Sequence, residues 1–292
     1  MGSLATHFSA FLFLFPIGIR RLLSSFSLYL KSPHLFRSQP WHLSQPAWKN
    51  IDLYVLLIAL PIAAFSEFFW FITFSGHPTY RFTFFLQSSV LFLLWVVIIS
   101  VVLHVNFDFF AVQENLLFLF AGISFLIEYS ITDQGYTGLA GRTYELLGAL
   151  TLVSAASCIV LSIKPTAFFA DVVLSMSLVF KGTWVLQAGL YLFSDAIAPK
   201  GCHKMPLLPV DGKSDLDCVL EEDRLRGVAL IDLLFIVHAI MIFILNFLLF
   251  GVLSYKRNLR ASGAGNLLTA EIESESMLMR SLPDFEIEIS QV

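Results

Sequence analysis

Three ionisable side chains, Glu67, Lys181 and His238, lie well inside long apolar stretches of the sequence. A charged group in the hydrocarbon core of a bilayer costs about 2.5 to 3.5 kcal/mol on insertion scales, so each is expected to be shielded and paired by neighbouring helices. Two interpretations follow. The three groups either neutralise one another and fix the packing of the helices, or they form a polar site for a proton, an ion or a small ligand.

The stretch from Thr166 to Phe193 can cross a bilayer and carries Lys181 near its middle. Small or polar residues recur on one narrow stripe of this helix, at Asp171, Ser175, Gly182 and Gly189. Such a stripe lets a neighbouring backbone approach closely. An adjacent face carries Ser177, Lys181, Trp184 and Ala188, and we expect it to be the polar one. The residues predicted to line an intramembrane binding site are Glu67, Lys181, Trp184, Gln187 and His238.

Composition identifies the class of protein. The 292 residues are 57% hydrophobic and only 14% charged, against about 45 to 50% and 25% in soluble domains. The sequence predicts an all-α membrane protein, a bundle of seven transmembrane helices occupying residues 1–254. The seven predicted spans are residues 8–30, 51–74, 82–105, 109–131, 144–163, 166–193 and 227–253. Residues 255–292 are polar and acidic, and we expect a disordered cytosolic tail.

The first apolar segment allows two interpretations. Pro16, Arg20 and Arg21 interrupt it, so it is either a transmembrane helix whose arginines reach toward the headgroups or an amphipathic anchor lying in the interface. The opening residues Met1–Thr6 also fit the loose pattern for N-myristoylation, which would require a cytosolic N-terminus. Neither the depth of this segment nor that modification is decided by the sequence.

The distribution of basic residues predicts the orientation. With seven spans and a cytosolic C-terminus, the cytosolic side carries more of the lysines and arginines than the opposite side, as the positive-inside rule requires. The N-terminus is then lumenal or extracellular. Protease added to sealed vesicles is expected to remove an epitope tag at Val292 and to spare a tag inserted between Pro199 and Asp217. The reverse pattern of protection would invert the topology.

Two of the three cysteines, Cys202 and Cys218, share the long loop that this orientation places outside the cytosol. Oxidising compartments permit disulfides, so we expect these two to be bonded. The third, Cys158, lies in an apolar span and is expected to be a packing residue.

Motifs for catalysis and metal binding are missing from the sequence. It contains no HExxH, no GxSxG, no phosphate-binding loop with its lysine, and no pair of aspartates in adjacent spans. The histidines are scattered singly, so we expect no metal site, no cofactor and no enzymatic activity. The glycine-rich stretch Asp133–Arg142 is predicted to be a connecting turn. Carboxylates near span ends are expected to meet the headgroup region; they are Glu114, Glu128, Glu145, Asp171 and Asp232.

Several short motifs occur in a recognisable order. They are MGSLATH, IGI before Arg20, PWHLSQPAWKNIDLYVLLIALPIAAFSEFF with Glu67, FKGTWVLQAGLYL, and FIVHA with His238. In this order the chain resembles a divergent plant member of the transmembrane-protein-45 family, predicted seven-span proteins without an established molecular activity. The resemblance implies seven spans. The chain departs from the family where histidines are frequent near spans three to five, and it has Lys181 where glutamine is usual.

Three classes of function are compatible with these features. A transporter- or receptor-like protein would use the region of Glu67, Lys181 and His238 as a polar cavity for a small molecule or an ion. A non-catalytic scaffold or trafficking factor would act through its helices and a cytosolic partner of the acidic tail. A membrane-embedded enzyme is the third class. All three place the protein among membrane lipids, in the endomembrane system or the plasma membrane, and nothing in the charge pattern indicates binding of nucleic acid.

Overall fold

Seven long helices make up most of the part of the chain that the structure describes. This structure is a computed structural model, and it describes residues 4–41, 51–73, 78–106, 113–132, 136–194, 201–203 and 216–280. Within those residues all seven helices are long and apolar enough to cross a membrane. They are α1 (Leu4–Lys31), α2 (Ile51–Thr73), α3 (Pro78–Asn106), α4 (Glu114–Thr132), α5 (Gly138–Ile163), α6 (Phe168–Phe193) and α7 (Glu221–Arg280). The predicted all-α multi-pass membrane protein is confirmed.

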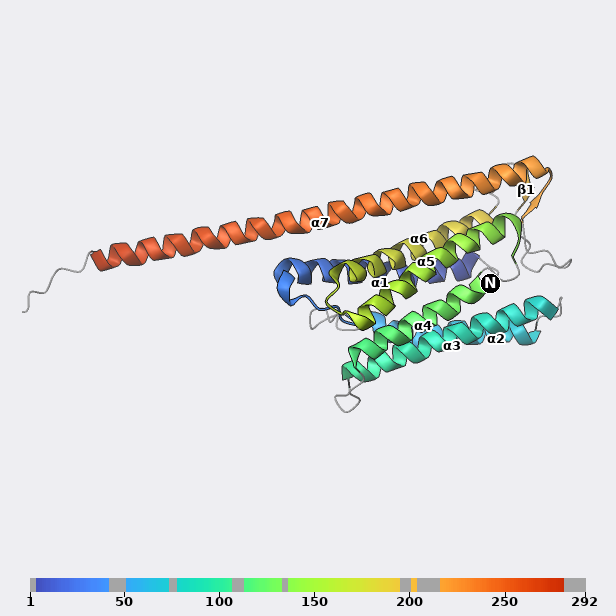
Figure 1. The fold of residues 1–292 in the computed structure, drawn as a ribbon, viewed down its shortest axis with the longest axis horizontal. Helices are drawn as coiled ribbons and strands as arrows, with labels where there is room; N and C mark the ends of the chain where they lie inside the picture. Colours follow the sequence, from blue (N-terminus) through green and yellow to red (C-terminus); the bar gives the residue numbers. More distant parts are fainter. Residues whose placement is uncertain are drawn as a thin grey trace, which may run out of the picture. The chain divides into compact units, whose positions relative to one another are not determined.

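The chain divides into two compact units, Met1–Asn246 and Phe247–Val292. The first contains α1 to α6 and the first part of α7. In it α1 runs alongside α6, α2 alongside α3, and α4 alongside α5 (Figure 1). Helix α6 also packs on α5, and α3 on α4.

The contact between α1 and α6 depends on glycine. A Cβ atom placed on Gly18 would lie 2.7 Å from the backbone nitrogen of Val179, and one on Gly182 would lie 2.9 Å from that of Phe15. Side chains at these positions would push the two backbones apart, so the glycines permit the close approach. The small-residue stripe predicted on 166–193 therefore serves helix packing, and its partner is α1.

This packing also decides how the first apolar segment is arranged. Helix α1 continues through Pro16, Arg20 and Arg21, and it buries Arg21 against the rest of the bundle. An amphipathic anchor on the membrane surface would have no such partner. The first segment is therefore a helix of the bundle, and its Arg21 is buried in an ion pair with Asp171 rather than directed toward the headgroups.

Two segments that the sequence predicts to be non-helical are helical in the structure. Helix α5 begins at Gly138, so the second half of the predicted turn Asp133–Arg142 is helical; Leu139 and Ala140 are fully buried, and their packing favours an early helix start. Gly138 has a φ of 57°, which glycine adopts without strain. Helix α7 continues to Arg280, where the sequence predicts a disordered tail from residue 255. Leucine, alanine, glutamate and methionine are frequent in this extension and favour a helix locally.

The link between α6 and α7 carries a disulfide. Cys202 and Cys218 are bonded, as the sequence predicts. They pair directly opposite each other in a two-stranded antiparallel ladder, β1 (Cys202–His203) and β2 (Asp217–Cys218). This covalent link holds together the ends of the segment between the two helices.

Candidate functional site

Lys181 on α6 is paired with Glu128 on α4. Its ammonium nitrogen lies 2.7 Å from each of the two carboxylate oxygens, and it also lies 5.3 Å from the ring centre of Phe125. Lys181 is only 3% exposed. The buried cation is thus neutralised inside the bundle, as expected, but its partner is Glu128 rather than Glu67.

Glu128 was expected to meet the headgroup region because it stands near the end of its predicted span. The structure contradicts this. Helix α4 ends at Thr132, yet the lysine on α6 draws Glu128 inward, because a buried ammonium needs a carboxylate at its own depth. Thr132 donates its hydroxyl to the backbone oxygen of Glu128 at 2.7 Å and so satisfies the last turn of the helix.

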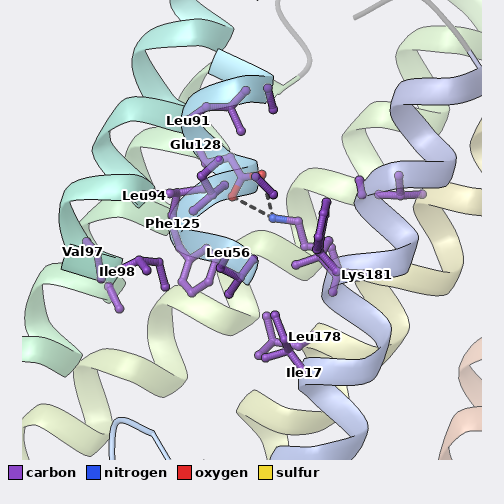
Figure 2. Close-up of a pocket in the computed structure, with 18 of the residues that line it drawn as sticks. Ile17, Leu56, Leu91, Leu94, Val97, Ile98, Phe125, Glu128, Leu178 and Lys181 are labelled. Carbon is purple, nitrogen blue, oxygen red and sulfur yellow. Dashed lines mark hydrogen bonds and ion pairs between the residues drawn. The ribbon is translucent and has the colours of Figure 1, made fainter. Parts of the chain in front are cut away.

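A pocket of about 660 Å³ lies next to this ion pair. Residues of α1 to α6 line it, and Figure 2 shows Lys181 and Glu128 meeting at its wall, among mostly apolar side chains. This volume lies within the range of roughly 300 to 1,000 Å³ that is usual for small-molecule sites. A pocket of this size, largely apolar and with an ion pair in its wall, can hold an organic molecule inside the bilayer.

Polar and apolar groups are separated along the pocket. Toward the C-terminal ends of α2 and α4 the lining includes Glu67, Gln87, Glu128, Thr132 and Lys181. Glu67 is buried, at 7% exposure, and lines the pocket, as the sequence predicts for a site residue. It is not, however, the partner of Lys181. Toward the N-terminal ends of α2 and α4 the lining is apolar; it includes Leu56, Leu60, Ile98, Val101, Leu117 and Leu178.

An ion pair between α1 and α2 bounds the apolar section. Arg20 contacts Asp52 in the first turn of α2, and both side chains are about a quarter exposed. The pocket therefore has a buried ion pair, Lys181 with Glu128, on one side of its apolar section and a partly exposed one on the other.

The other predicted site residues lie away from the pocket: Trp184 and Gln187 are on another face of α6, and His238 is on α7. His238 on α7 contacts the hydroxyl of Thr183 at 2.9 Å through Nε2 and the side-chain oxygen of Gln187 at 2.9 Å through Nδ1. Trp184 lies beside this imidazole, with ring centres 6.2 Å apart, and donates to the backbone oxygen of Thr143 at 3.3 Å. These contacts tie α6 to α5 and α7. Trp184, Gln187 and His238 are thus brought together, but apart from the pocket that Glu67 and Lys181 line.

A second buried ion pair, between Arg21 and Asp171, lies where α1 passes the start of α6. Asp171 is fully buried and bonded to Arg21, and it also accepts the hydroxyls of Ser25 and Ser38. Arg21 donates further to the backbone oxygens of Gln39 and Pro40. The sequence placed Asp171 near the headgroups and suggested that Arg21 reaches toward them, so it missed this network. Both terminal nitrogens of Arg21 and both carboxylate oxygens of Asp171 are bonded within the protein, which indicates a structural role.

A metal site needs several ligating side chains grouped together. Among the described residues, no three histidine, cysteine, aspartate or glutamate side chains are grouped closely enough to hold a metal ion. The pocket offers one ammonium, two guanidinium groups, several carboxyl or amide oxygens and a large apolar surface.

Comparison with known proteins yields one family match. Residues 113–251 match the model of a family described as "Family of unknown function (DUF716)". The matched part covers α4, α5, α6 and most of the apolar part of α7, so it includes Glu128, Lys181 and His238. No curated protein matches the chain.

Proposed function

We propose that the protein is a non-catalytic, transporter- or receptor-like membrane protein that binds a small molecule in the pocket lined by α1 to α6. The observation that carries this proposal is the coincidence of the pocket with the Lys181–Glu128 ion pair. A purely structural ion pair is best surrounded by tightly packed side chains, because voids beside it cost packing energy. A pocket at the same place fits a binding role.

The experiment labels the pocket from within the bilayer. The full chain, in lipid nanodiscs, is irradiated with a decyl diazirine that has no headgroup, and labelled residues are mapped by mass spectrometry. Leu60 lines the pocket, whereas Ile58 on the same helix is 63% exposed and outside the lining, so it reports contact with bulk lipid.

A variant that fills the pocket with a large side chain tests whether labelling of Leu60 comes from a molecule inside it. Leu94→Trp places an indole in the lining, and Val96→Trp, at a position that is 54% exposed on the same helix, is its matched control. We expect Leu94→Trp to reduce labelling of Leu60 at least several-fold while labelling of Ile58 is unchanged, and Val96→Trp to change neither. Equal labelling of Leu60 in all three proteins would reject the binding function and favour the scaffold role.

Family membership is a further part of the proposal. The match to a family of unknown function over residues 113–251 is consistent with the resemblance to the transmembrane-protein-45 family and supports placing the chain there. We also propose that the N-terminus and the disulfide lie outside the cytosol, which the distribution of basic residues supports.

A further inference from the structure

We infer that the ligand of this pocket is an uncharged single-chain amphiphile with a hydroxyl headgroup, bound with the hydroxyl at Lys181 and Glu128 and the chain directed toward Asp52. This inference rests on the proposed function and specifies the chemistry of its ligand. Three properties of the pocket carry it: the balance of charge in the lining, the donors and acceptors of the ion pair, and the separation of polar from apolar residues.

The cations of the lining are already matched. Three cationic side chains line the pocket, Arg20, Arg21 and Lys181, and each is ion-paired with a carboxylate. An anionic headgroup would have to compete with one of those carboxylates and would leave a negative charge uncompensated in the membrane interior, which is strongly unfavourable. The matched cations therefore disfavour an anionic headgroup.

The ion pair offers both a donor and an acceptor to an uncharged headgroup. An ammonium carries three N–H donors, and Glu128 is the one hydrogen-bond acceptor of Lys181 among the described residues. The side chain of Glu128 is 21% exposed and lines the pocket beside the ammonium, and each carboxylate oxygen has a second lone pair with which to accept a hydrogen bond. A hydroxyl can accept from Lys181 and donate to Glu128 at the same time, whereas an ether or a ketone can only accept.

The apolar section sets the direction of the chain. On α2 the lining is apolar from Leu56 to Ala63, and on α3 from Leu94 to Val101. Each stretch is about 10 Å long at the helical rise of 1.5 Å per residue, which suits a medium-length alkyl chain. Figure 2 shows Leu56, Ile98 and Leu178 along the pocket away from the dashed contacts of the ion pair. The Arg20–Asp52 pair at the far end is more exposed, so water competes there for a headgroup.

The test uses four probes that share one chain and differ only in the headgroup. Decanol, decyl methyl ether, decyl sulfate and decyltrimethylammonium compete with the decyl diazirine for labelling of Leu60 in nanodiscs. We expect decanol to halve the labelling at a concentration at least about tenfold below those of both charged probes, with the ether in between. A charged probe that competes as well as decanol would overturn the inference and leave the binding function intact.

Two variants separate the ion pair from general effects on folding. Lys181→Met combined with Glu128→Leu removes donor and acceptor together and keeps the pocket neutral, so the advantage of decanol over the ether should disappear. Arg37→Met combined with Glu114→Leu removes an ion pair outside the lining and should preserve that advantage. Preference for decanol that survives in the first double variant would overturn the assignment of the headgroup site.

Orientation is tested with two photoreactive decanols. A diazirine at the chain terminus should label Val101 or Leu117, and a diazirine beside the hydroxyl should label Gln87 or Thr132. The reverse pattern would place the hydroxyl at Arg20 and Asp52 and overturn the proposed direction. If no probe protects Leu60 and Leu94→Trp also leaves its labelling unchanged, the proposed function itself fails.

Discussion

Lys181→Met and Glu128→Gln are each expected to destabilise the protein, and the double variant is expected to recover part of the loss. Each single change strands one charged or strongly polar partner in the bundle, which costs roughly 3 to 5 kcal/mol for a fully buried pair. The loss should be larger for Glu128→Gln, because the stranded lysine is 4% exposed in its side chain and bonds to no second carboxylate in the described part of the chain. The side chain of Glu128 is 21% exposed, so a stranded carboxyl group is partly relieved by contact with water.

The measurement is a double-mutant cycle by SDS titration in mixed micelles. A coupling energy on the order of 1 to 3 kcal/mol is expected between positions 181 and 128, as for residues in direct contact. Glu67→Gln supplies the matched control, because Glu67 lines the same pocket but is not the partner of Lys181. Coupling between 181 and 67 should be close to zero. A large coupling with Glu67 and none with Glu128 would restore the pairing that the sequence predicts.

The seven spans and the close packing of one helix face could be predicted because both depend on local patterns. Apolar runs of sufficient length identify spans wherever they occur. The glycine stripe on α6 follows from helical periodicity, although the sequence does not name the helix that lies against it. The disulfide between Cys202 and Cys218 followed from their sharing one loop and from the predicted orientation, and the structure contains it.

The partner of Lys181 could not be predicted, because depth alone does not identify a neighbour. Glu67 stands sixteen residues after the start of α2, and Glu128 fourteen residues after the start of α4. Lys181 stands thirteen residues after the start of α6, and all three helices begin on the same side of the bundle. Equal depth thus fits both carboxylates. Which helix lies beside which depends on contacts distant in sequence, and a single sequence does not contain them.

The neighbour that each side of α6 contacts was equally difficult to predict. Lys181 and Trp184 are three residues apart and were assigned to one polar face, yet one lines the pocket and the other contacts Thr143 and the ring of His238. Because α6 is buried on several sides, it packs against α1 and α5, and its side chains contact α7 through Thr183, Gln187 and Phe180. A face in such a helix is defined by its neighbours rather than by its own composition.

Gly182→Ala and Gly18→Ala are expected to destabilise the protein although alanine is the better helix former. In an open helix position this change gains about 1 kcal/mol. At Gly182 and Gly18, however, the new methyl group would meet backbone nitrogens of the opposite helix at 2.9 and 2.7 Å. Backbone atoms cannot rotate away as side chains do, so α1 and α6 must separate. Overpacking of this kind costs about 1 to 3 kcal/mol.

Gly251→Ala is the matched control, because nothing lies within 4 Å of a Cβ placed there. It is expected to be neutral or slightly stabilising in the same SDS titration, whereas both interface variants lower the midpoint. Since Gly182 and Gly18 belong to one helix contact, the first substitution already separates the helices, and the second should cost less than it does alone. Interface variants as stable as Gly251→Ala would show that α1 does not pack on α6, and that the first segment lies elsewhere in the membrane.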